Sequence, residues 1–83
     1  MMNDHDFQTI IICAFRYCLG RTTYVTDEMA NILQDNISKL TDNTKAVIIK
    51  DIQYSAENNR LGMNCDRVVW LKLLEIMKND YNE

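Results

Sequence analysis

Residues able to carry out chemistry are scarce in this chain. It holds one histidine, His5, and three cysteines, Cys13, Cys18 and Cys65. The cysteines include no C-x-x-C pair and His5 is the only histidine, so no zinc-binding set is formed. His5 is also the only histidine that could act as the base of a nucleophile site, and it lies at a terminus that we expect to be mobile. We expect His5 to be solvated at the start of the first helix. The sequence therefore predicts no catalytic residue, no metal site and no cofactor.

The acidic residues and the glycines add no further site. Asp27 and Glu28 are adjacent, and adjacent residues of a helix point in different directions, so they form a poor acid–base pair. Gly20 and Gly62 are the only glycines and lie far apart, so they cannot build a phosphate-binding glycine loop. We expect that the protein is not an enzyme.

One segment is unusual in its residue types. Residues 15–24 place two arginines and two tyrosines around the end of a helix and a turn. Arginine and tyrosine are enriched at binding hot spots, because each combines a large contact area with polar recognition. The candidate interface residues are therefore Arg16, Tyr17, Arg21 and Tyr24. A structural role is the alternative: the arginines would complement the negative helix end, one of them pairing with an acid such as Asp66, and the tyrosines would fill the junction.

Length and charge limit the class of protein. The chain has 83 residues, which predicts one domain over 1–83 with a small core and a thin stability margin. Nine basic and twelve acidic residues give a net charge of −3, and the signs are interspersed. Direct nucleic-acid binding is not expected, because it needs a basic stripe. Self-association into a homo-oligomer is one way to supply extra stability.

The cysteines and the N-terminus indicate a reducing compartment. An odd number of cysteines without framework spacing argues against disulfides, so we expect all three to pack in the core as small hydrophobes. Residues 1–6 are acidic, unlike the start of a signal peptide. The longest apolar run, residues 10–15, is far shorter than the roughly 20 residues that span a bilayer. We predict a cytoplasmic protein without a membrane segment.

Apolar residues recur at helical spacing along the whole chain. The pattern predicts helices over about 4–19, 23–39, 42–59 and 65–79. Asn3 or Asp4 can cap the first helix, residues 41–44 the third, and Asn64 or Asp66 the fourth. Gly20 and Gly62 are expected at left-handed C-terminal positions. The fold class is all-α, as a compact four-helix bundle or an orthogonal helical array.

The first predicted helix is apolar nearly all round. Such a helix is usually buried on several sides, so we expect it to be the central helix of the domain or one that a partner subunit covers. Trp70, the only tryptophan, is expected to anchor the core.

The segment Ala14–Tyr24 resembles a group of short phage and prophage proteins of Gram-positive bacteria. The resemblance extends to residues 61–62 and 66–70. It carries no known activity, but it implies a bacterial host cell and a protein that binds a host protein stoichiometrically, as anti-CRISPR and other anti-defence proteins do.

We therefore expect a phage-type accessory protein that works by protein–protein binding and inhibits a bacterial defence nuclease. One alternative is a dimeric helix-turn-helix-like DNA-binding regulator, whose recognition helix would begin at Asn43, Thr44 and Lys45. Another is a structural, self-assembling subunit.

Overall fold

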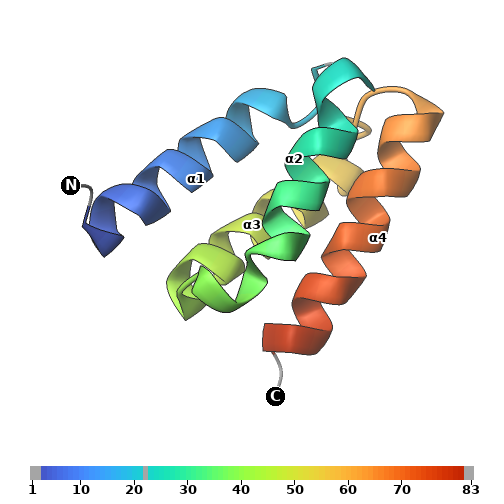
Figure 1. The fold of residues 1–83 in the computed structure, drawn as a ribbon. Helices are drawn as coiled ribbons and strands as arrows, with labels where there is room; N and C mark the ends of the chain where they lie inside the picture. The colour runs from blue at the N-terminus through green and yellow to red at the C-terminus, as the bar shows by residue number, and fades with distance from the viewer. Residues whose placement is uncertain (1–2, 22, 82–83) are drawn as a thin grey trace.

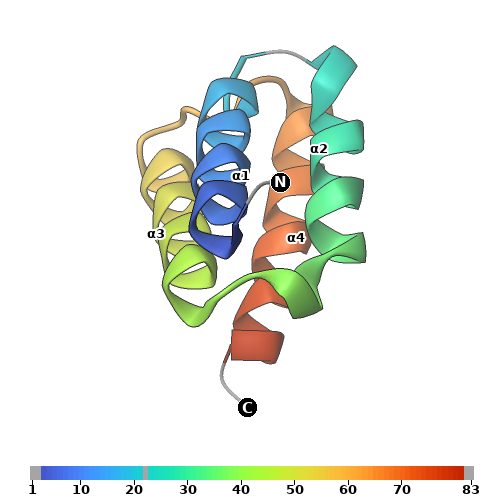
Figure 2. The ribbon, with the colours of Figure 1, turned by 60° about the vertical axis from the view of Figure 1, so that its left-hand side comes forward.

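The chain folds as a bundle of four α-helices (Figures 1 and 2). The computed structural model describes residues 3–21 and 23–81, with the backbone alone at Thr23 and Tyr24. The elements are α1 (Asp4–Cys18), α2 (Thr23–Asp35), a 3-10 turn η1 (Ile37–Lys39), α3 (Asp42–Glu57) and α4 (Asn64–Tyr81). Strands are absent from these residues. The predicted all-α class is confirmed, and of the two predicted arrangements the chain adopts the bundle.

Three helices begin where short polar side chains meet unpaired backbone amides. Asn3 caps α1 by accepting a hydrogen bond from the Asp6 N–H at 2.8 Å. Thr41 caps α3 by accepting one from the Thr44 N–H at 3.2 Å. At the start of α4, Asp66 reaches back and accepts from the Met63 N–H at 3.2 Å. These contacts satisfy donors that have no partner inside their own helix.

One of the two predicted glycine helix ends is wrong. Gly20 follows the end of α1 with a φ of +77°, as predicted. At the end of α3 the left-handed residue is Asn59, with a φ of +55°, and the Arg60 N–H donates to the Ser55 carbonyl at 2.7 Å. Gly62 is left-handed too, but it lies later, in the loop before α4. Asparagine tolerates this backbone region better than most residues, which is why the helix needs no glycine there.

The second helix is shorter than its apolar pattern predicts. It ends at Asp35, and the chain continues as η1 up to Lys39. Asn36 is the reason, because its side-chain amide donates to the Ile32 carbonyl at 2.8 Å. The backbone then tightens, and the Lys39 N–H donates to the Asn36 carbonyl at 2.8 Å. Asparagine offers the backbone such local alternatives to a continuing helix.

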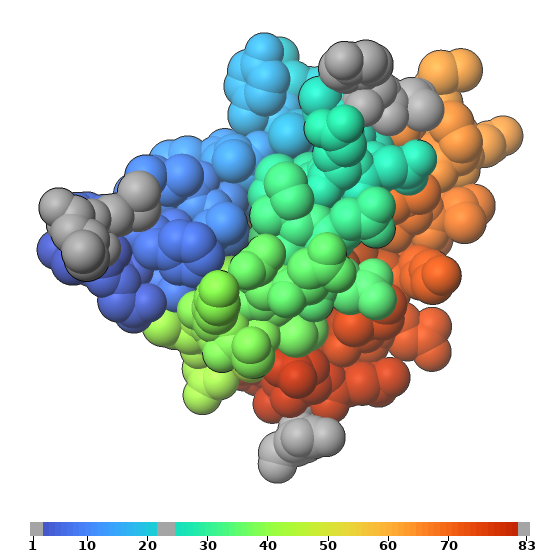
Figure 3. Space-filling view, in the orientation of Figure 1, coloured from blue at the N-terminus to red at the C-terminus, as the bar shows by residue number. Residues whose placement is uncertain are grey.

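The core is organised around two aromatic rings. Phe15 of α1 and Trp70 of α4 meet edge to face, with ring centroids 5.6 Å apart and an interplanar angle of 84°. Both side chains are fully buried, so the expectation that Trp70 anchors the core is confirmed. The gap between the ribbons of α1 and α2 in Figure 1 is filled by side chains in Figure 3. Around the two rings pack aliphatic side chains from every helix, among them Leu33, Ile48, Ile52, Leu73 and Met77.

The central helix is α4, and the prediction that the first helix is central is wrong. Helix α4 packs extensively against both α2 and α3, whereas α1 packs less on its two neighbours. Only one face of α1 reaches the core, through Ile11, Phe15 and Cys18. Ile10, Cys13 and Tyr17 lie on the opposite side and are exposed. We name these three residues the α1 outer stripe.

A buried glutamine joins α1 to the connection between α2 and α3. Gln8 is 7% exposed. Its Nε2 donates to the Lys39 carbonyl at 2.7 Å, and its Oε1 accepts from the Thr41 N–H at 3.1 Å. One side chain therefore satisfies two backbone groups at the point where the chain turns into α3. Leaving such groups unpaired is costly, so Gln8 fixes the position of α1 against that turn.

Replacing this glutamine should weaken the fold measurably. Gln8→Ala leaves the Lys39 carbonyl and the Thr41 N–H without their partner, and we expect a loss of about 1–3 kcal/mol in the free energy of unfolding. The matched control is Gln34→Ala, since Gln34 is an exposed glutamine of α2 and should change stability by less than about 0.5 kcal/mol. Urea unfolding followed by circular dichroism measures both. Equal effects of the two substitutions would show that the Gln8 contacts do not stabilise the fold.

Candidate functional site

Arg16 lies in the last turn of α1 and forms an ion pair with α3. Its Nε donates to the Asp51 carboxylate at 2.7 Å, so its partner is Asp51 and not the suggested Asp66. The hydrogen bond to Asp51 and the charge of Asp51 raise the pKa of Arg16 above its ordinary value. The Arg16 side chain is 57% exposed, and exposed ion pairs contribute little stability, typically about 0–1 kcal/mol. The pair mainly orients the guanidinium.

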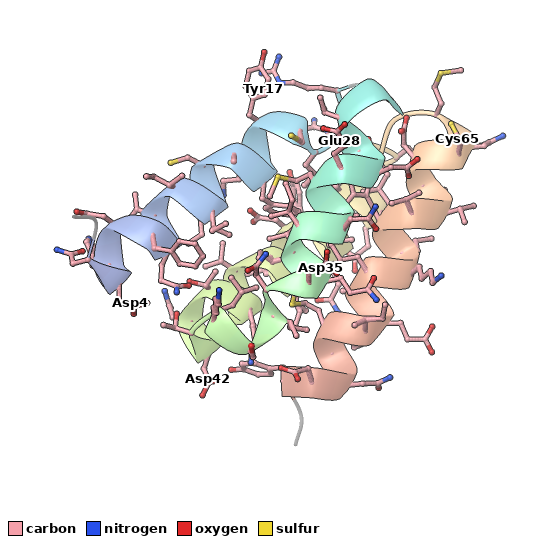
Figure 4. The ribbon with its side chains drawn as sticks, in the orientation of Figure 1. Asp4, Tyr17, Glu28, Asp35, Asp42 and Cys65 are labelled. Atoms are coloured by element: carbon pink, nitrogen blue, oxygen red, sulfur yellow. The ribbon has the colours of Figure 1, made fainter. Side chains whose placement is uncertain are left out.

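Tyr17 and Arg21 form an exposed stacked pair. The Arg21 guanidinium carbon lies 4.7 Å from the centre of the Tyr17 ring, a cation–π contact. Tyr17 is 66% exposed and projects away from the bundle at the end of α1 (Figure 4), so it does not fill the junction between helices. Tyr24 belongs to α2, and its side chain lies outside the described residues. Three of the four predicted interface residues therefore gather at the end of α1.

The cysteines do not all lie in the core, contrary to the prediction. Only Cys18 is buried, and burial raises the pKa of its thiol above the ordinary value. Cys13 and Cys65 are exposed. Cys13 belongs to the α1 outer stripe, one helical turn from Ile10 and one turn from Tyr17. Ile10 is 52% exposed, so the stripe combines apolar and aromatic surface along the outside of α1.

A pocket at this end of the molecule was not predicted from the sequence. Its volume is about 470 Å³, and it is lined by Arg16, Arg21 and Arg60 together with the glycines Gly20 and Gly62. Two connections meet here, the one between α1 and α2 and the one between α3 and α4. A Cβ atom on Gly20 would lie 2.3 Å from the Arg60 carbonyl oxygen, so only a glycine allows this approach. Arg60 is remote from Arg16 and Arg21 in sequence, and no local pattern indicates that they share a pocket.

The residues suggested for DNA reading are not presented together. At the start of α3, Thr44 is buried, and Lys45 forms an ion pair with Asp80 of α4 at 2.6 Å. Only Asn43 of this set is exposed. Two of the three residues are therefore engaged within the bundle, Thr44 by burial and Lys45 by its ion pair.

The described residues form neither a metal-binding cluster nor a membrane-spanning helix. Within residues 3–21 and 23–81, no cluster of three or more histidine, cysteine, aspartate or glutamate side chains is placed to hold a metal ion. Over the same residues no helix has the length and apolar character needed to cross a membrane.

Comparisons with known protein families, with curated proteins and with solved structures find no match to this chain.

Gly20 packs against the backbone of Arg60, whereas Gly62 packs against the side chain of Asp66, so alanine at the two positions should have different effects on stability. Gly20→Ala and Gly62→Ala both place an alanine in left-handed backbone, which costs about 1–2 kcal/mol. At Gly62 the nearest atom to the new methyl group is an Asp66 side-chain oxygen at 3.0 Å, whereas at Gly20 it is backbone at 2.3 Å. We expect Gly20→Ala to be the more destabilising of the two in thermal unfolding. An equal or smaller effect at Gly20 would mean that the two connections are not in close contact.

Proposed function

We propose that this chain is a binding protein that acts by stoichiometric contact with a partner protein through the α1 outer stripe. The observation that carries the proposal is the exposure of Ile10, Cys13 and Tyr17 on a helix whose opposite face is packed in the core. An apolar stripe on a small protein marks surface that a partner can cover. The stripe continues at its C-terminal end into the stacked Tyr17–Arg21 pair.

The residue types at this end suit binding at low entropic cost. A tyrosine presents a large contact area with few rotatable bonds, and Arg21 is already held over its ring. Arg16 is likewise oriented by Asp51. Because these side chains are positioned before a partner arrives, less conformational freedom is lost on binding.

The stripe would be the centre of a larger interface. Stable interfaces bury about 800 Å² per partner, and the described surface of this chain is 5594 Å² in total. The surface extends from Arg16 across Asp51 onto α3, where Tyr54 lies one turn further along the helix and is 56% exposed. Tyr54 is therefore the first α3 residue that we assign to the same interface.

The resemblance to phage and prophage proteins supports a partner from a bacterial host. One of the similar segments, residues 14–24, contains Arg16, Tyr17 and Arg21. On this basis the partner is a host protein in the bacterial cytoplasm. A defence nuclease inhibited in the manner of an anti-CRISPR protein is the first class to test.

The test compares two double variants with the unchanged chain. Ile10→Ala combined with Tyr17→Ala removes the apolar centre of the stripe. Met63→Ala combined with Val68→Ala is the matched control, because these residues are at least as exposed, at 70% and 67%, but lie just before α4 and in its first part. Both double variants should remain folded, since all four side chains lie at the surface.

A tagged pull-down from bacterial lysate identifies the host partner, and calorimetry with the purified partner then measures affinity and stoichiometry. We expect the chain and its partner to bind at one defined molar ratio. The stripe variant should lose about 2 kcal/mol or more in binding free energy, as at hot spots, and the control variant should change little. Unchanged affinity of the stripe variant would refute the assignment. Self-association without a host partner, detected by light scattering, would refute the proposed partner class.

A further inference from the structure

The pocket at the end of the bundle concentrates positive charge on an acidic protein. The chain has four arginines and a net charge of −3, yet three of the four, Arg16, Arg21 and Arg60, line this one pocket. They come from the end of α1, from the connection that follows it and from the connection after α3. The pocket is therefore assembled by the tertiary fold rather than by one basic segment.

The backbone holds these elements together at fixed positions. Gly20 lies so close to the Arg60 carbonyl that a side chain would not fit between them. The Arg60 N–H is bound to the Ser55 carbonyl at 2.7 Å, and the Arg21 N–H to the Cys18 carbonyl at 3.2 Å. Both arginines are thus anchored by their backbones to the helices that precede them. The spacing between the two arginines follows from packing and does not depend on a ligand.

Carboxylates neutralise only part of this charge. Asp51 takes the Nε–H of Arg16. Asp66 lies beside Gly62, but the residue is 3% exposed and its carboxylate accepts from the Met63 N–H. Among the described residues no ion pair joins Arg21 or Arg60 to a carboxylate. Among these residues Arg60 therefore has no carboxylate partner, and Arg21, although its guanidinium is stacked on the Tyr17 ring, has none either. The N–H donors of both arginines can still bind an anion from solution.

We propose that this pocket binds the phosphate group of a small phosphorylated ligand. A guanidinium presents N–H donors in a planar fork that matches the oxygens of phosphate. Several guanidinium groups together offer more N–H donors than the two oxygens of one carboxylate can accept. The volume of about 470 Å³ is many times the roughly 30 Å³ that one water molecule occupies, so it admits a group larger than an isolated phosphate. This site goes beyond the proposed partner binding, which is centred on the α1 outer stripe.

The experiment is a ¹H–¹⁵N titration of the full chain with inorganic pyrophosphate at low salt, with calorimetry to measure affinity. Adenosine triphosphate is the second arm, and succinate, a dicarboxylate, is the third. We expect pyrophosphate to shift the amide signals of Gly20, Arg21, Arg60 and Gly62. If adenosine triphosphate binds as tightly as pyrophosphate, the site recognises the phosphate groups alone. If adenosine triphosphate binds more tightly than pyrophosphate, the site also contacts the nucleoside. Both results support the proposal.

Two arginine variants separate the pocket from general charge. Arg60→Ala should weaken pyrophosphate binding by about tenfold or more, as expected for a lost charge-assisted hydrogen bond. Arg67→Ala removes the same charge from the one arginine that does not line the pocket, and should weaken binding less than about twofold. Arg60→Lys, which keeps the charge but loses the planar fork, should recover part of the affinity.

Three results would overturn the proposal: no shifts at the pocket, equal losses in Arg60→Ala and Arg67→Ala, or succinate binding as tightly as pyrophosphate. The site and the proposed protein interface can fail separately. Ile10→Ala should weaken partner binding while leaving pyrophosphate affinity unchanged, because Ile10 does not line the pocket.

Discussion

The burial of Trp70 is the constraint on which the rest of the bundle depends. Its indole is fully enclosed, with Phe15 of α1 against it edge to face and α2 and α3 packed along the same helix. A chain of this size has one small core, so a single large ring sets where each helix can lie. Because α4 holds the central position, α1 has only one face to contribute to the interior. Its remaining apolar side chains are left at the surface.

That division of α1 links the fold to the proposed activity. The inner face supplies Phe15 to the core, and Gln8 fixes the same helix to the turn before α3. The outer face is thereby presented on a rigid support, which suits a binding surface better than a mobile loop does. Arg16 at the end of α1 and Arg21 just after it also line the pocket beside Gly20 and Arg60. One helix therefore serves the core, the proposed protein interface and the proposed anion site.

Features set by nearby residues could be predicted from the sequence, and features set by packing could not. The cap at Asn3 and the buried anchor at Trp70 follow from local chemistry and residue type. The choice of which α1 face is buried requires knowledge of the neighbouring helices, so the expectation of a central first helix failed. The Arg60 side of the pocket was missed for the same reason. Three of the four candidate interface residues gather as a cluster, but Arg16 pairs with Asp51, which no sequence pattern indicates.

The native cysteines offer the most direct test of whether a partner covers the α1 outer stripe. Cys13 is exposed in the stripe, Cys65 is exposed on α4, and Cys18 is buried, so one chain contains the probe and both controls. Alkylation at each thiol would be measured by mass spectrometry, with and without the purified partner. We expect the partner to slow alkylation of Cys13 and to leave that of Cys65 unchanged. Unchanged alkylation of Cys13 in the saturated complex would contradict it.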